Sequence, residues 1–133
     1  MEGFCFVHAA DLHLDSPFAA MKVDSPRLAQ AFIEASRASL QALIDVCIGH
    51  NADFLVLSGD VFDAERRSIR AQLELFEALS RLAERGIDTY MACGNHDALS
   101  GWRAILDWPE EVHFFGGDEV ESFPVSCGGR VAA

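Results

Sequence analysis

Residues 54–63 read FLVLSGDVFD, and this stretch decides the fold class. It opens with a short apolar run of the kind that forms a buried parallel strand. Gly59 and Asp60 then make the chain polar and allow a sharp turn where that strand ends. Two further short apolar runs, residues 4–9 and 89–92, lie on either side along the chain. We therefore expect three buried strands.

Amphipathic helical segments separate these three runs. Ser25 and Pro26 are a favourable helix start, with Ser as the N-cap and Pro at the first helical position. Apolar residues then recur at helical spacing as far as Gly49, which stands where a C-cap belongs. Ser68 is the expected N-cap of a second helix, and Gly86 follows its last turn. This alternation predicts an α/β fold with a parallel βαβαβ core, right-handed crossovers and helices covering the sheet.

The last third of the chain has a weaker pattern. We expect a short helix over residues 100–107 and a fourth strand over residues 112–115. Residues 120–125 and 130–132 are expected to pair as a hairpin around a Cys-Gly-Gly sequence. No repeat or linker interrupts the pattern, so we expect residues 1–133 to belong to one domain.

Composition and charge narrow the function classes. Half of the 133 residues are hydrophobic, which is enough for a core, and no apolar run approaches the length of a membrane span. The N-terminus has no basic region, so we expect no secretory signal and a cytoplasmic protein. The 10 Lys and Arg against 21 Asp and Glu give a net charge of -11, which excludes nucleic-acid binding by general electrostatics alone. A phosphate ligand would need bound cations or a local basic patch.

The cysteines give no sign of cross-linking. Cys5, Cys47, Cys93 and Cys127 are evenly spread and form no C-x-x-C pair. This spacing suggests neither a zinc ribbon nor a disulfide framework. We expect them to be reduced residues of the core.

A polar cluster follows each of the three expected strands. The clusters are residues 11–13 (DLH), 59–63 (GDVFD) and 94–97 (GNHD). Because the carboxyl ends of parallel strands meet at one edge of a sheet, these side chains should lie around one crevice. Carboxylate, imidazole and amide ligands suit Mn, Fe, Zn or Ca better than Cu(I). Each cluster alone is an ordinary polar turn, but all three in order favour a metal site.

These motifs closely resemble D-x-H, G-D-x-x-D and G-N-H-[DE] of the calcineurin-like metallophosphoesterase superfamily. The resemblance extends over about residues 4–97. Residues 6–18 and 59–63 look like the branch that holds the SbcD-like nucleases of DNA double-strand-break repair and their bacterial relatives. The resemblance implies an α/β/β/α sandwich, of which residues 1–133 would be the N-terminal part.

The resemblance also implies the metal ligands. Asp11 and His13 would bind the first metal, Asp60 would bridge both metals, and Asn95 would bind the second. The implied cofactors are two divalent ions, with Mn as the first choice and Fe, Zn or Mg as alternatives. Two such ions about 4 Å apart can clamp an in-line phosphoryl displacement.

The same resemblance implies two catalytic residues. His96 would act on the leaving oxygen or the scissile phosphate, and Asp63 would orient and charge that histidine. A His paired with Asp can stay protonated near neutral pH and donate to a leaving alkoxide.

One departure from the family pattern limits this assignment. The family completes its site with a later isolated His and a terminal Gly-His-x-His, and neither is found here. After His96 the only histidine is His113, which we interpret as a structural residue of a strand. The chain is therefore expected to stop before the last metal-ligand motifs. One face of its sheet should then expose apolar residues and favour self-association.

The leading hypothesis is a divalent-metal-dependent phosphodiesterase, an exonuclease or endonuclease of DNA repair that uses a two-metal mechanism. One alternative is a metallophosphoesterase for small phosphoesters or cyclic nucleotides. Another is a catalytically incomplete fragment that binds metal or dimerises. The partners implied are DNA, an SMC-like ATPase subunit in the full-length protein and a second copy of the chain as a homodimer. No membrane partner is expected.

Overall fold

Four parallel strands form the central sheet, in the order β1-β2-β3-β4. The computed structural model describes residues 3–16, 25–62, 68–92, 106–116, 119–127 and 130–131. The elements, in chain order, are β1 (Phe6–Ala10), α1 (Pro26–Gly49), β2 (Phe54–Ser58), α2 (Ile69–Ala83), β3 (Asp88–Ala92), β4 (Val112–Phe114), β5 (Ser126–Cys127) and β6 (Arg130–Val131). The parallel α/β core and the fourth strand predicted from the sequence are confirmed. The expectation that the first strand is buried is wrong, because β1 is an edge strand whose residues are exposed or half-buried.

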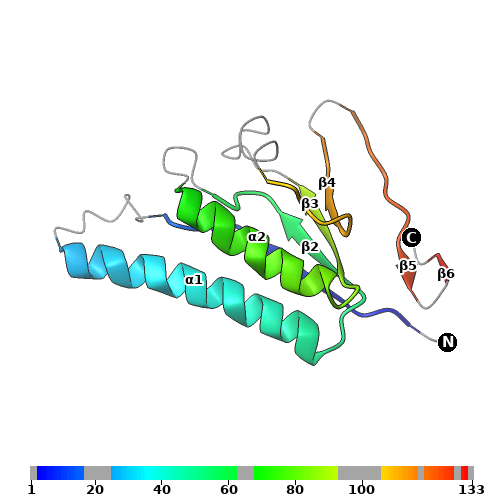
Figure 1. The fold of residues 1–133 in the computed structure, drawn as a ribbon, viewed down its shortest axis with the longest axis horizontal. Helices are drawn as coiled ribbons and strands as arrows, with labels where there is room; N and C mark the ends of the chain where they lie inside the picture. The colour runs from blue at the N-terminus through cyan, green and yellow to red at the C-terminus, as the bar shows by residue number, and fades with distance from the viewer. Residues whose placement is uncertain are drawn as a thin grey trace.

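Both helices lie on the same side of the sheet, next to each other (Figure 1). The sheet residues that face them alternate with those on the opposite face, as a parallel ladder requires. Leu55 and Leu57 of β2 and Met91 of β3 are fully buried under Ile44 of α1 and Leu79 of α2. This layer is the main core of the protein.

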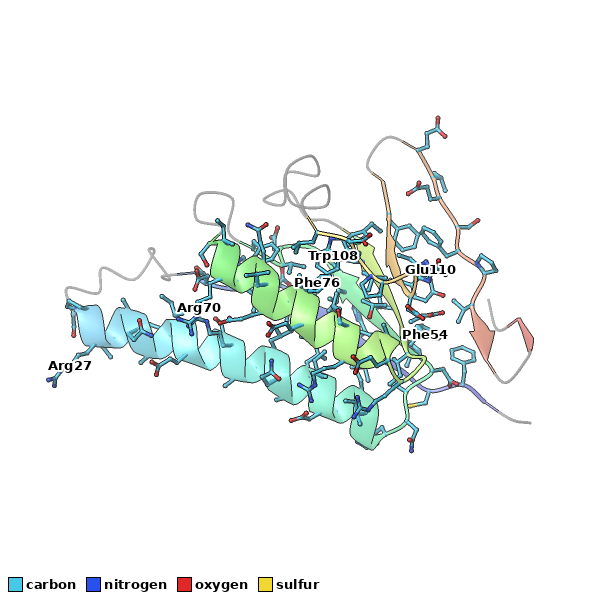
Figure 2. The ribbon with its side chains drawn as sticks, in the orientation of Figure 1. Arg27, Phe54, Arg70, Phe76, Trp108 and Glu110 are labelled. Atoms are coloured by element: carbon cyan, nitrogen blue, oxygen red, sulfur yellow. The ribbon has the colours of Figure 1, made fainter. Side chains whose placement is uncertain are left out.

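Three aromatic side chains pack against one another on the β4 side of this core. Phe76 of α2 contacts Trp108, with 5.3 Å between the ring centroids (Figure 2). Trp108 in turn contacts Phe114 of β4 at 5.4 Å. The sheet therefore stays covered by α2 as far as its last strand.

The opposite face of the sheet, here called the open face, is only partly covered. Phe54 and Tyr90 are buried there beneath Val125, from the segment that precedes β5. At β1, however, Phe6 is 50% exposed. The predicted exposure of apolar residues on one face is therefore confirmed at this edge strand.

The capping signals identified the helices, with one correction. The Ser68 hydroxyl accepts a hydrogen bond from the amide of Ala71 at 3.1 Å, as an N-cap should. The C-cap predicted at Gly49 is wrong, because α1 includes Gly49 and the left-handed residue is Asn51, with φ of 49°. Asn tolerates this conformation because its short polar side chain can bond locally.

Two further expectations need correction. The first hairpin arm is residues 126–127 rather than 120–125, because Phe123 and Val125 pack their side chains on the open face instead of pairing as a strand. Cys5 is not a core residue, because the chain before β1 is exposed to solvent. Cys47 is buried as expected, and this burial raises the pKa of its thiol. Most of the helix expected over residues 100–107 lies outside the described residues.

Candidate metal centre

Two loops leave the sheet side by side at the carboxyl ends of β1 and β2. The strands end in register, with Ala10 opposite Ser58. Beyond them the pairing continues, since the His13 amide donates to the Asp60 carbonyl at 3.0 Å and the Leu14 amide to the Val61 carbonyl at 2.8 Å. The two loops, residues 11–16 and 59–62, therefore form one hydrogen-bonded unit.

These loops contain an unusual set of backbone angles. Asp11, His13 and Asp15 have φ of 54°, 44° and 64°, and Asp60 has φ of 40°. The left-handed region costs a residue with a side chain about 1–2 kcal/mol. Such conformations persist where the surroundings impose them, and they concentrate at functional sites.

The imposed conformation has an identifiable anchor. Leu14, which lies between two of the left-handed residues, is 2% exposed, and Phe62 of the second loop is fully buried. The two residues also form a parallel bridge. Because these apolar side chains are fixed in the core, the backbone of the two loops beside them is held in place.

Asp11, His13 and Asp60 come together at this edge. One ligand atom of each lies within 4.8 Å of the others. This grouping is compatible with one divalent ion, whose ligands lie about 2.0–2.3 Å from the metal. Two carboxylates this close repel each other, and a divalent cation between them would remove that repulsion.

The donor set therefore fits a divalent metal. Carboxylate oxygen and imidazole nitrogen are ligands of Mn, Fe and Zn. Among the described residues, the two loops bring together the three candidate ligands that the D-x-H and G-D motifs predicted. Their role as ligands stays a prediction, and Asp63, Asn95 and His96 lie outside the described residues.

His113 lies elsewhere in the molecule. Its ring stacks on Tyr90, with centroids 4.8 Å apart, and contacts Phe123 at 5.2 Å. Its Nε2 is 3.9 Å from the Asp88 carboxylate. This placement supports the interpretation of His113 as a structural residue.

Two polar contacts lie beside the centre. His8 Nε2 and Ser58 Oγ lie 2.8 Å apart, at hydrogen-bond distance between β1 and β2. Arg37 of α1 donates to the carboxylate of Asp15 at 3.0 Å. Arg37 was not singled out from the sequence, although it follows Ile33 by one helical turn and precedes Leu40 by three residues, which places it beside the apolar stripe of α1.

Comparison with known proteins now defines the family. The family described as calcineurin-like phosphoesterase matches residues 5–130. The chain belongs to this family. It is 44% identical, over 110 residues, to the uncharacterized metallophosphoesterase YhaO of Bacillus subtilis, a match that covers 83% of this chain and 27% of YhaO.

Two archaeal relatives are more distant. The DNA double-strand break repair protein Mre11 of Methanococcus maripaludis is 32% identical over 92 residues, covering 69% of this chain and 23% of that protein. Mre11 of Archaeoglobus fulgidus is 30% identical over 95 residues, covering 71% and 20%. The chain thus spans about a fifth to a quarter of the length of these relatives. They are consistent with the nuclease branch that the motifs predicted.

Members of this family bind divalent metals, and the grouping of Asp11, His13 and Asp60 suits that property. Among the described residues, no helix has the length and apolar character needed to span a membrane.

Proposed function

We propose that the chain is the N-terminal part of a divalent-metal-dependent phosphodiesterase that cleaves DNA in double-strand-break repair. The grouping of Asp11, His13 and Asp60 on two strained, paired loops carries this proposal. The names of the Mre11 relatives support the choice of DNA as substrate. Manganese is the metal we assign, from the resemblance to the nuclease branch, and the carboxylate and imidazole donors suit it as they suit Fe and Zn.

We assign each of the two metal ions its own ligands. Asp11 and His13 would hold one ion, Asp60 would lie between two ions, and Asn95 would hold the second. A divalent ion supplies charge stabilisation to a phosphoryl group in displacement. The paired loops keep the ligands of the first ion in place before any ion arrives, so little ordering is left for the binding step.

We assign proton transfer to His96, with Asp63 as its orienting partner. A protonated imidazole beside a carboxylate can deliver its proton to the leaving oxygen of the scissile bond. This assignment is supported by the GNHD and GDVFD motifs at residues 94–97 and 59–63.

The net charge of -11 favours one alternative function. A small phosphodiester or a cyclic nucleotide requires no extended basic surface, whereas a DNA backbone does. DNA binding would instead require local cations, and Arg70, whose side chain is 73% exposed, is one that a DNA phosphate could reach.

One experiment separates these functions. The chain, with Mn²⁺, is tested on linear double-stranded DNA and on bis(p-nitrophenyl) phosphate, with His96→Ala as the control. Our proposal predicts that both substrates are hydrolysed by the wild type and neither by the variant. Hydrolysis of the small diester alone would support the alternative function. No hydrolysis despite bound Mn²⁺ would indicate a catalytically incomplete chain.

The assembly is part of the same proposal. We assign to the full-length protein a homodimeric state and an SMC-like ATPase partner, both from the resemblance to the nuclease branch, and the cytoplasmic location expected from the sequence. Co-purification of the full-length protein with such an ATPase tests the partner, and recovery of the full-length protein without any ATPase would contradict it.

A further inference from the structure

A chain of ion pairs connects the loop of the candidate ligands to both helices. Arg37 of α1 donates through Nη2 to Asp15 Oδ1 at 3.0 Å. Its Nε lies 2.8 Å from Glu74 Oε2 of α2, an ion pair in which the N–H does not have hydrogen-bond geometry. Arg70 in turn donates to the other oxygen of Glu74 at 2.9 Å. One arginine therefore connects the ligand loop, α1 and α2.

This network is partly removed from water. The side chains of Asp15, Arg37 and Glu74 are 14%, 20% and 26% exposed. Solvent screens such pairs less than it screens ion pairs on the surface. Removal of one partner also leaves the other charge partly buried without compensation. The network is thus able to influence the conformation of the loop.

The position of Asp15 makes that influence specific to the metal centre. Asp15 follows His13 by two residues and is itself left-handed, with φ of 64°. The Ser16 amide donates to the His13 carbonyl at 3.1 Å, which closes a turn around Asp15. Fixing the Asp15 carboxylate on α1 therefore fixes the end of the loop whose other residues include the candidate ligands.

We propose that Arg37 is a positioning residue, whose ion pair with Asp15 holds residues 11–16 in the conformation that turns His13 toward Asp11 and Asp60. The inference rests on the metal site of the proposed function and is independent of its DNA substrate. Glu74 aligns the guanidinium from the other helix.

The chain offers a matched control on the same two helices. Arg81 of α2 donates to Gln41 of α1 at 2.7 Å and lies 3.3 Å from Asp45 of α1. Arg81→Gln therefore removes an arginine between α1 and α2 without touching the ligand loop. Arg37→Gln removes an arginine that also holds Asp15.

The first measurement is amide hydrogen exchange in the metal-free chain. Arg37→Gln should make the amides of His13 and Leu14 exchange about tenfold faster, because the loop opens locally more often. Asp15→Asn should do the same, since Asn accepts the left-handed conformation but carries no charge. Arg81→Gln should leave these two amides unchanged. The Met91 amide, within the sheet, reports on global unfolding in every variant.

The second measurement is Mn²⁺ affinity by calorimetry. Both loop variants should bind Mn²⁺ about tenfold more weakly than the wild type, as outer residues of a metal site do when changed. The double variant Asp15→Asn with Arg37→Gln should bind no more weakly than either single variant, because one interaction is lost in all three.

Each contrary outcome has a distinct meaning. Unchanged exchange of His13 and Leu14 in Arg37→Gln would overturn the inference, as would an equal effect of Arg81→Gln or additive losses in the double variant. If the wild-type chain binds no Mn²⁺, the proposed function fails while the exchange measurement still decides the role of Arg37.

Discussion

At the carboxyl edge of the sheet, His13 shares a small space with the carboxylates of Asp11 and Asp60. On the open face, His113 lies flat against Tyr90, and the Asp88 carboxylate is 3.9 Å from its Nε2. Both places combine histidine with aspartate, but among the described residues only the first brings two carboxylates within 4.8 Å of the histidine as a possible metal-binding group.

The backbone explains the difference. His13 is left-handed and lies in a loop, whereas His113 belongs to a regular strand, β4. In a strand the side chain stands perpendicular to the sheet and meets its cross-strand neighbour, which for His113 is Tyr90. In the loop, neighbouring strand ends bring carboxylates from two segments to one imidazole. The backbone conformation therefore decides which of the two histidines is a candidate ligand.

The largest expected effect tests the carboxyl edge directly. Asp60→Asn keeps the size of the side chain and its tolerance of φ 40° but removes the charge that we propose bridges the two ions. We expect Mn²⁺-dependent hydrolysis to fall by about 1,000-fold, equivalent to roughly 4 kcal/mol. The matched change Asp88→Asn on the open face should keep full activity. Equal activity of the Asp60 variant and the wild type would remove Asp60 from the site.

A second change loosens the anchor of the same edge. Leu14→Ala removes a side chain that is 2% exposed, which should lower the free energy of unfolding by about 3 kcal/mol. Mn²⁺ affinity should fall as well, because the ligand loop loses its anchor. Val125→Ala, on the open face, should reduce stability by about 1–2 kcal/mol without changing affinity. Denaturant titration and calorimetry measure the two quantities; unchanged affinity in Leu14→Ala would separate the anchor from the site.

The aromatic cluster is tested by His113→Ala. Loss of its stacking on Tyr90 and Phe123 should lower the free energy of unfolding by about 1–1.5 kcal/mol. Metal affinity should stay within twofold of the wild-type value, because His113 is placed apart from the candidate ligands. A large loss of Mn²⁺ binding in this variant would contradict the comparison between the two histidines.

The smallest effect concerns the exposed part of the open face. Phe6 is 50% exposed, and its ring stacks on Phe54 with 5.2 Å between the centroids. Phe6→Ser replaces this exposed apolar side chain with a small polar one. If the chain self-associates through this face, as its sequence predicts, the variant should associate about fivefold more weakly. Light scattering over a wide concentration range measures this. A wild type that stays monomeric throughout would show the prediction of a homodimer to be wrong for this chain.

Much of the fold could be predicted because its signals are local. The apolar run of β2, the Ser68 cap and the glycine after α2 each act within a few residues. The expected first arm of the hairpin failed because distant contacts prevailed over a local pattern. The segment before β5 has an extended pattern, but Phe123 and Val125 use it to cover Tyr90 rather than to pair.

By itself, the sequence determined which residue types follow each strand, and hence that Asp11, His13 and Asp60 would reach one edge of a parallel sheet. Only the tertiary structure decided how they are held there. The left-handed residues Asp11 and His13 donate backbone hydrogen bonds to Gly59 and Asp60, and Asp15 pairs with an arginine 22 residues away. Motif spacing records the order of side chains along the chain. The forces that orient them come from segments that meet only after folding.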